Sequence, residues 1–144
     1  MNAGAILGIL VGLVAVATVV GVLWQRSNGH VREIDDASTV ISVGELNSDA
    51  VAGRGATLLQ FSTEVCAPCR TTHQLLGDLA TELNGVAHVD VDVSHRPDLA
   101  NRYNLLQSPT TFILDGSGVV RARIGGAPRP AEVRAELDRI LAAA

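Results

Sequence analysis

The chain has 144 residues with a formal net charge of −4 at pH 7, and aromatic residues make up 3% of it. This length accommodates one compact domain and an anchor, but not two full domains. An acidic chain with few aromatic residues argues against nucleic-acid binding, which calls for a basic surface and stacking platforms. Two cysteines are too few for a disulfide-rich scaffold.

The first charged side chain in the sequence is Arg26, and residues 3–24 form a continuous uncharged, mostly apolar stretch. As a helix this stretch spans ~33 Å at about 1.5 Å per residue, enough to cross a bilayer core of roughly 30 Å. Trp24 closes the stretch, where an indole favours the headgroup region. We therefore predict that residues 1–25 are a transmembrane anchor.

A cleaved signal peptide is the alternative for this segment. No Lys or Arg precedes the apolar stretch, and the stretch exceeds a typical signal core of ~7–15 residues, so a retained anchor fits better. Gly4, Gly8 and Gly12 recur at four-residue spacing, which would allow two anchor helices to dimerise, although such patterns are common by chance.

Arg26 and Arg32 flank the C-terminal end of the anchor, while only the α-amino group marks its other end. The positive-inside rule therefore favours a single-pass protein of the cell membrane with its soluble part in the cytoplasm. An extracytoplasmic soluble part is the alternative, because two arginines are a small bias.

After the anchor, residues 26–38 are polar and lack a sustained apolar period, which predicts a tether. Residues 39–144 are predicted to form one domain. The elements predicted in chain order are a strand at 39–43, a short helix or turn at 44–50, a strand at 57–62, a helix at 68–83, a strand at 86–93, a helix at 97–103, a hairpin of strands at 110–114 and 119–124, and a helix from Pro130. This order predicts an α/β fold with a mixed sheet flanked by helices.

Cys66 and Cys69 are the only cysteines, and such a Cys-x-x-Cys pair is used either for redox exchange or for metal ligation. His73 follows Cys69 by one helical turn, which raises the metal alternative. No second Cys pair or paired His supplies a fourth ligand at a standard spacing, so we expect no metal site.

Three sequence features, two of them containing proline and one containing glycine, stand at characteristic places relative to the predicted strands and helices. Cys66-Ala67-Pro68-Cys69 follows a predicted buried strand and opens a predicted helix; Ser108-Pro109-Thr110 precedes a strand about forty residues later; and Gly125-Gly126 follows the last predicted strand. In these features the chain resembles the thioredoxin family from about residue 40 to residue 142. The resemblance implies a thioredoxin-like fold behind the anchor helix, and thiol–disulfide exchange without a cofactor.

A cysteine at a helix N-terminus has its thiolate stabilised by unpaired backbone N–H groups and by the helix dipole. Cys66 is therefore expected to be the nucleophile, and Cys69 to resolve the mixed disulfide. Pro68 would stiffen the turn between them. By resemblance, Pro109 follows a cis bond and faces the pair.

The resemblance also implies that Ser108, Thr110 and Gly125 lie at the substrate-binding surface. The sequence departs from the family nearer the cysteines. Val65 and Ser62 stand where the family usually carries Trp. 

Gln60 replaces the family's buried Asp, and Asp90 replaces a Lys on the neighbouring strand. We hypothesise that Asp90 supplies the carboxylate that moves a proton for Cys69. As an alternative, Asp90 is a structural polar residue at a strand edge.

The sequence thus predicts a membrane-anchored thiol–disulfide oxidoreductase that reduces protein disulfides. Its expected partners are protein or small-molecule disulfides, a thiol electron donor, and the membrane through residues 3–24. The alternative is a membrane-tethered module that uses the same fold to hold a partner or a metal without redox turnover.

Overall fold

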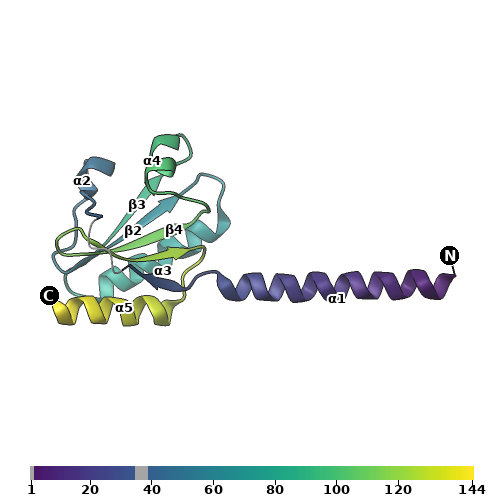
Figure 1. The fold of residues 1–144 in the computed structure, drawn as a ribbon. Coiled ribbons are helices and arrows are strands. Elements are labelled where there is room, and N and C mark those ends of the chain that lie inside the picture. Colours follow the sequence, from purple (N-terminus) through teal and green to yellow (C-terminus); the bar gives the residue numbers. More distant parts are fainter. Residues whose placement is uncertain (1, 35–38) are drawn as a thin grey trace.

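The computed structural model describes residues 2–34 and 39–144. Figure 1 shows a long helix joined to a layered α/β domain. The elements are α1 (Ala3–Ser27), β1 (Val31–Glu33), α2 (Val43–Leu46), β2 (Ala56–Ser62), α3 (Ala67–Glu82), β3 (Val86–Asp92), α4 (Pro97–Arg102), β4 (Thr110–Asp115), β5 (Val120–Gly125) and α5 (Pro130–Ala143).

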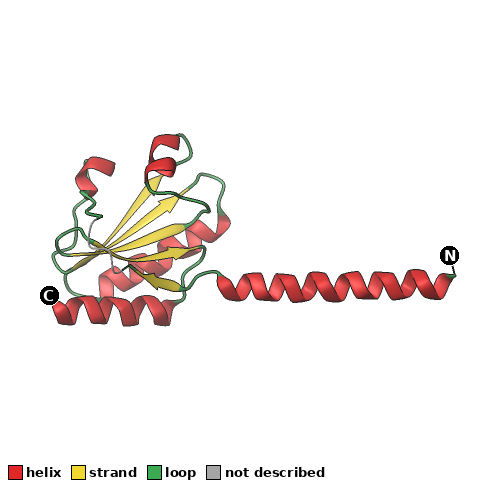
Figure 2. Cartoon of the chain, in the orientation of Figure 1, coloured by secondary structure: helices red, strands yellow, loops and turns green. Residues whose placement is uncertain are grey.

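The strands form one mixed sheet in the order β1-β5-β4-β2-β3. β2 and β3 are parallel, whereas β4 runs antiparallel to both β2 and β5, and β1 runs antiparallel to β5. All seven residues of β2 are buried, as expected for a central strand covered on both faces. The predicted mixed sheet flanked by helices is confirmed (Figure 2).

Two hydrophobic cores lie on opposite faces of this sheet because side chains alternate along each strand. Leu59 and Phe61 of β2 point into the core that α2 and α4 cover. Leu58 points the other way, into the core shared with α3 and α5. The α3–α5 face also buries residues at helical spacing: Leu76, Leu79, Val133, Leu137 and Ile140.

The segment after α1 differs from the predicted tether. Val31–Glu33 pair with β5 as the edge strand of the sheet, with Val31 opposite Ile124. The strand predicted at 39–43 is wrong, because Val40 makes only an isolated bridge with Val119. A three-residue edge strand has too few side chains to produce an alternating pattern, so the sequence carried no signal for it. Residues 35–38 of the predicted tether lie outside the described residues.

α1 stands clear of the domain, and none of its 25 residues is buried. By length and composition it could cross a membrane, as a signal sequence near an N-terminus also could. The helix continues to Ser27, two residues beyond the predicted anchor boundary. It then joins β1 through only three residues, Asn28–His30.

Candidate active site

Cys66 and Cys69 form a disulfide at the start of α3. Cys66 is the N-cap residue of the helix, and its sulfur accepts a hydrogen bond from the Cys69 amide at 3.2 Å. Cys66 is half-buried, whereas Cys69 is only 4% exposed. The helix begins here because Pro68 fits a first turn, where no intrahelical donor is needed. The geometry gives the two sulfur atoms unequal access to a partner.

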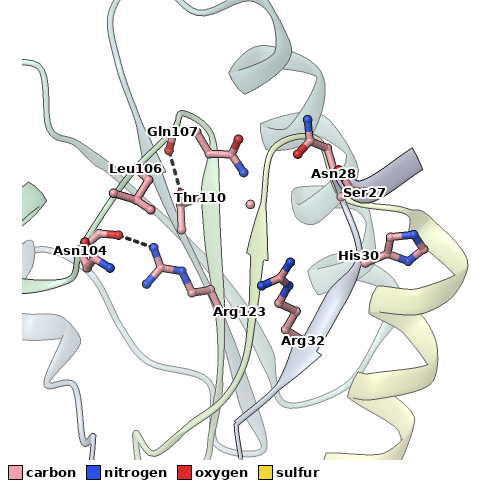
Figure 3. A pocket seen from close by; sticks show the side chains of 11 residues that line it. Ser27, Asn28, His30, Arg32, Asn104, Leu106, Gln107, Thr110 and Arg123 are labelled. Carbon is pink, nitrogen blue, oxygen red and sulfur yellow. Dashed lines mark hydrogen bonds between the residues drawn. The ribbon is translucent and has the colours of Figure 1, made fainter. Parts of the chain in front are cut away.

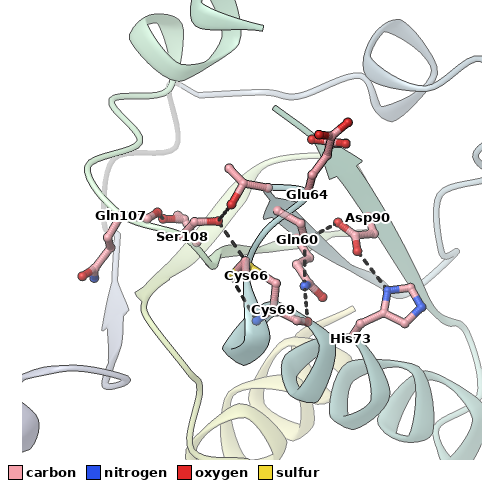
Figure 4. Close-up of a disulfide and its surroundings, with 12 residues drawn as sticks. Gln60, Glu64, Cys66, Cys69, His73, Asp90, Gln107 and Ser108 are labelled. Atoms are coloured by element: carbon pink, nitrogen blue, oxygen red, sulfur yellow. Dashed lines mark hydrogen bonds and ion pairs between the residues drawn. A yellow bond between two sulfur atoms is a disulfide. The ribbon is translucent and has the colours of Figure 1, made fainter. Parts of the chain in front are cut away.

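The loop before β4 faces the Cys pair (Figure 4). The Ser108–Pro109 bond is cis, as the resemblance implies. Ser108 Oγ lies 3.3 Å from Cys69 Sγ, and the Pro109 carbonyl accepts a hydrogen bond from the Gly126 amide at 2.8 Å. These contacts hold the loop against both the cysteines and the end of β5.

Thr110 and Gly125 were predicted at the substrate-binding surface together with Ser108. The Thr110 side chain is 1% exposed and its hydroxyl donates to the Gln107 carbonyl at 2.7 Å. The Gly125 carbonyl accepts a hydrogen bond from the Gly29 amide at 2.9 Å. Both residues therefore already have partners within the chain, and of the three only Ser108 contacts a cysteine sulfur.

Asp90 lies beside the start of α3 and is held by two side chains (Figure 4). Ser62 Oγ donates to one carboxylate oxygen at 2.6 Å, and His73 Nδ1 lies 2.9 Å from the other. A pocket of about 340 Å³ opens here, and its lining includes Asp90, His73, Cys66 and Cys69. The structure thus brings the predicted carboxylate and both cysteines to one pocket.

Gln60 is fully buried beneath this pocket and joins three elements. Its side-chain amide donates to Ser62 Oγ and to the Cys69 carbonyl, both at 2.9 Å. Its carbonyl oxygen lies 3.1 Å from His88 Nε2, which must therefore carry the proton. Gln60 makes hydrogen bonds where the family's buried Asp would instead bring a charge.

His88 has its pKa lowered from 6.5 to about 4, chiefly because burial disfavours the imidazolium. Repulsion from His73 lowers the pKa further, and the charge of Asp90 partly opposes both effects. The rings of His73 and His88 meet edge to face at 4.8 Å between centroids. His88 is thus a half-buried neutral histidine.

The sequence did not predict that Gln60, Ser62, Asp90 and His73 form one hydrogen-bonded set. A partial signal existed, because parallel pairing places Gln60 opposite Asp90 and Ser62 opposite Asp92 in the register of β2 and β3. The contribution of α3 required the tertiary structure. Val65, the other departure near the cysteines, is 98% exposed.

The metal alternative called for His73 beside the two cysteines. No group of three or more His, Cys, Asp or Glu side chains within residues 2–34 and 39–144 is arranged to hold a metal ion. His73 contacts Asp90 instead of completing a site with the two cysteines.

Comparison with known proteins agrees with this architecture. The family model described as Thioredoxin matches residues 39–139, more than half of the chain. Thioredoxin C-2 of Corynebacterium nephridii is 30% identical over 96 residues, covering 65% of this chain and 89% of that protein. The thioredoxin of Mycolicibacterium smegmatis is 27% identical over 110 residues, covering 74% of this chain and 97% of the relative.

Solved structures show the same fold. Fasciola hepatica thioredoxin has a TM-score of 0.52 at 25% identity, covering 60% of this chain and 82% of its own. Chloroplastic thioredoxin z has a TM-score of 0.57 at 24% identity, covering 69% and 87%. The shared fold and the Cys-x-x-Cys pair at the start of α3 define the class of protein: a thioredoxin-like fold with a pair of cysteines that can form a disulfide. The chain belongs to the thioredoxin family, and the family together with the Cys pair supports thiol–disulfide oxidoreductase chemistry.

Proposed function

We propose that the chain is a membrane-anchored oxidoreductase that reduces protein disulfides by cycling Cys66 and Cys69 between dithiol and disulfide. The observation that carries the proposal is the unequal access of the two sulfur atoms at the start of α3. Cys66 is half-buried at the N-cap, and Cys69 is buried behind it. An accessible attacking thiolate with a shielded second thiol is the arrangement that disulfide reduction requires.

The exchange proceeds in two steps. The Cys66 thiolate attacks one sulfur of the substrate disulfide, forming a mixed disulfide and releasing the other substrate sulfur as a thiolate. The Cys69 thiolate then attacks Cys66 Sγ, which closes the Cys66–Cys69 disulfide and releases the second substrate thiolate. Two electrons pass to the substrate, and a thiol donor restores the dithiol.

Cys69 must lose a proton before the second step, and we assign that proton to Asp90. Asp90 and Cys69 line the same pocket, whose volume of about 340 Å³ leaves room for bridging water. The other carboxylate oxygen contacts His73, whose side chain is 57% exposed to solvent. Ser108 and Pro109, on the opposite side of the cysteines, would position the backbone of the substrate.

Membrane attachment through residues 3–24 is part of the same proposal. The support is a fully exposed apolar helix, which water solvates poorly unless a bilayer covers it. The arginines after the apolar stretch favour the cytoplasmic side for the domain. 

Insulin reduction by the detergent-solubilised full chain, followed by turbidity with a thiol donor, tests the proposed reaction. Cys66→Ser should abolish turnover, whereas Cys69→Ser should accumulate a mixed disulfide that is visible on a non-reducing gel. A native chain that purifies with stoichiometric zinc and never cycles its cysteines would instead establish the metal-holding module.

A further inference from the structure

The anchor helix joins the domain at the edge of the sheet that carries Cys66. β2 ends at Ser62, four residues before Cys66. β4 is antiparallel to both β2 and β5, so β5 ends at the same edge as β2. β1 is antiparallel to β5 and therefore begins there. Figure 1 shows α1 leaving the domain from this side.

Hydrogen bonds hold the connection between α1 and β1 against the domain. The Gly29 amide donates to the Gly125 carbonyl at 2.9 Å. Glu132 of α5 accepts a hydrogen bond from the Val31 amide at 3.0 Å, and its other oxygen lies 3.0 Å from His30 Nδ1. The connection is therefore paired to both the sheet and α5.

The last turn of α1 takes part in the same set of contacts. The Arg26 carbonyl, left without a helical partner at the helix end, accepts from His30 Nε2 at 2.8 Å and from Arg129 at 3.2 Å. Gly29 adopts a φ of +79°, and a Cβ there would collide with the Ala127 carbonyl oxygen. Only glycine fits this close approach, so the direction of α1 relative to the domain is set by local structure.

The anchor connection and the active-site loop also share a pocket of about 400 Å³ (Figure 3). Its lining includes Asn28 and Gly29 of the connection together with Gln107 and Gly125. Gln107 immediately precedes Ser108, which contacts Cys69 Sγ. Measured across the sheet, the three strand spacings from β1 to β2 amount to roughly 14 Å.

These relations place the active site close to the bilayer if α1 crosses it. Ser27 lies ~4.5 Å beyond Trp24 along the helix, at about 1.5 Å per residue. The headgroup region on each side of a bilayer is roughly 5–7 Å deep. The edge of the sheet that carries Cys66 thus lies at the outer limit of the headgroups and faces them.

We propose that the substrate is a disulfide of a membrane-bound protein, held close to the bilayer surface, and not one that stands far above it. The inference rests on the proposed function, because it names the substrate class of the same cysteine pair. A domain fixed to its anchor keeps the local concentration of Cys66 high in a thin layer at the bilayer surface. Above that layer the local concentration of Cys66 is low.

The test uses the pre-reduced full chain reconstituted in phosphatidylcholine vesicles, in single turnovers. One substrate carries a disulfide-closed loop directly after a single transmembrane helix. The other raises the same loop on a helical stalk of about 27 residues, or ~40 Å. A soluble small-molecule disulfide reports the chemistry alone. In a comparison variant, 20 Gly/Ser residues inserted between Ser27 and Asn28 add a reach of ~25 Å.

We expect the native chain to reduce the membrane-proximal loop at least about tenfold faster than the raised loop, and the insertion variant to reduce the two within about twofold. Both chains should reduce the small-molecule disulfide equally. Equal rates of the native chain on the two loops, or a faster rate on the raised loop, would overturn the inference while leaving the reaction intact. Failure on the small-molecule disulfide would instead remove the proposed function.

Discussion

At the scale of single residues, the site departs from the family pattern at Gln60 on β2 and at Asp90 on the neighbouring strand β3. Gln60 takes the buried position and uses its amide to tie Ser62 and the Cys69 carbonyl together. Asp90 carries the charge one strand away, at the pocket and in contact with His73. Asp90 and both cysteines line the same pocket, whereas Gln60 lies buried beneath it.

Asp90→Asn should slow the second exchange step, because the amide cannot accept a proton from Cys69. We expect the mixed disulfide to persist about 10²-fold longer near neutral pH, with a flatter pH dependence, as measured by quenched-flow and non-reducing gels. 

Asp92→Asn on the same strand is the matched control, since the Asp92 carboxylate bonds only Ser94 in the described structure. An Asp90→Asn variant whose pH profile matches that of the native chain would leave Asp90 a purely structural role.

His88 should make stability depend on pH in a defined window. Its pKa is about 4 in the folded chain against 6.5 as the reference value, so the unfolded chain binds more protons between these values. Stability is then fully present above pH 6.5 and declines as the pH falls toward 4, by about 1–2 kcal/mol after solvent screening.

Urea unfolding of the detergent-solubilised chain, followed by circular dichroism across this window, measures the effect. His88→Gln should weaken the decline, while His95→Gln, at a side chain that is 85% exposed, should leave it unchanged. An unaltered decline in His88→Gln would attribute the pH dependence to other groups.

At the scale of elements, two short segments set the positions of two long helices. The start of α3 is set by Cys66 at the N-cap and Pro68 in the first turn, which together present the sulfur atoms at the end of β2. β1 has only three residues, yet it fixes how α1 leaves the domain. Glu132 of α5 adds a hydrogen bond from the Val31 amide at 3.0 Å to the pairing of this short edge strand.

Glu132→Ala should release β1, because the Val31 amide and His30 lose their acceptor together. Hydrogen exchange of the β1 amides should rise at least about tenfold, which corresponds to about 1.4 kcal/mol of lost protection. Glu82→Ala is the control. It removes an exposed ion pair between Glu82 of α3 and Arg134, which lies on α5 as Glu132 does. Unchanged exchange in β1 would show that strand pairing alone holds the connection.

At the scale of the whole molecule, an apolar helix and an oxidoreductase domain meet at one edge of the sheet. The domain buries its own two cores without using α1, whose side chains are all exposed. Lipid around α1 would therefore cover its exposed apolar side chains without disturbing the fold of the domain. It would also confine the cysteines to one side of a membrane.

A membrane-impermeant thiol reagent applied to intact, briefly reduced cells determines that side. If the arginines after the anchor set the orientation, Cys66 should be labelled only after the membrane is permeabilised. A Cys66→Ser variant gives the background. Labelling of intact cells at the level reached after permeabilisation would place the domain outside and connect it with disulfides of the cell envelope.

By itself the sequence determined the fold class, the Cys66–Cys69 pair, the cis-proline segment and the long apolar helix near the N-terminus. Each of these depends on residues that are close in the chain, on a regular apolar period, or on a motif of fixed spacing. Only the tertiary structure decided that β1 closes the sheet, that Ser62 and His73 hold Asp90, and that α1 leaves from the edge carrying the cysteines. These relations join residues from separate elements through single hydrogen bonds, which leave no periodic trace along the chain.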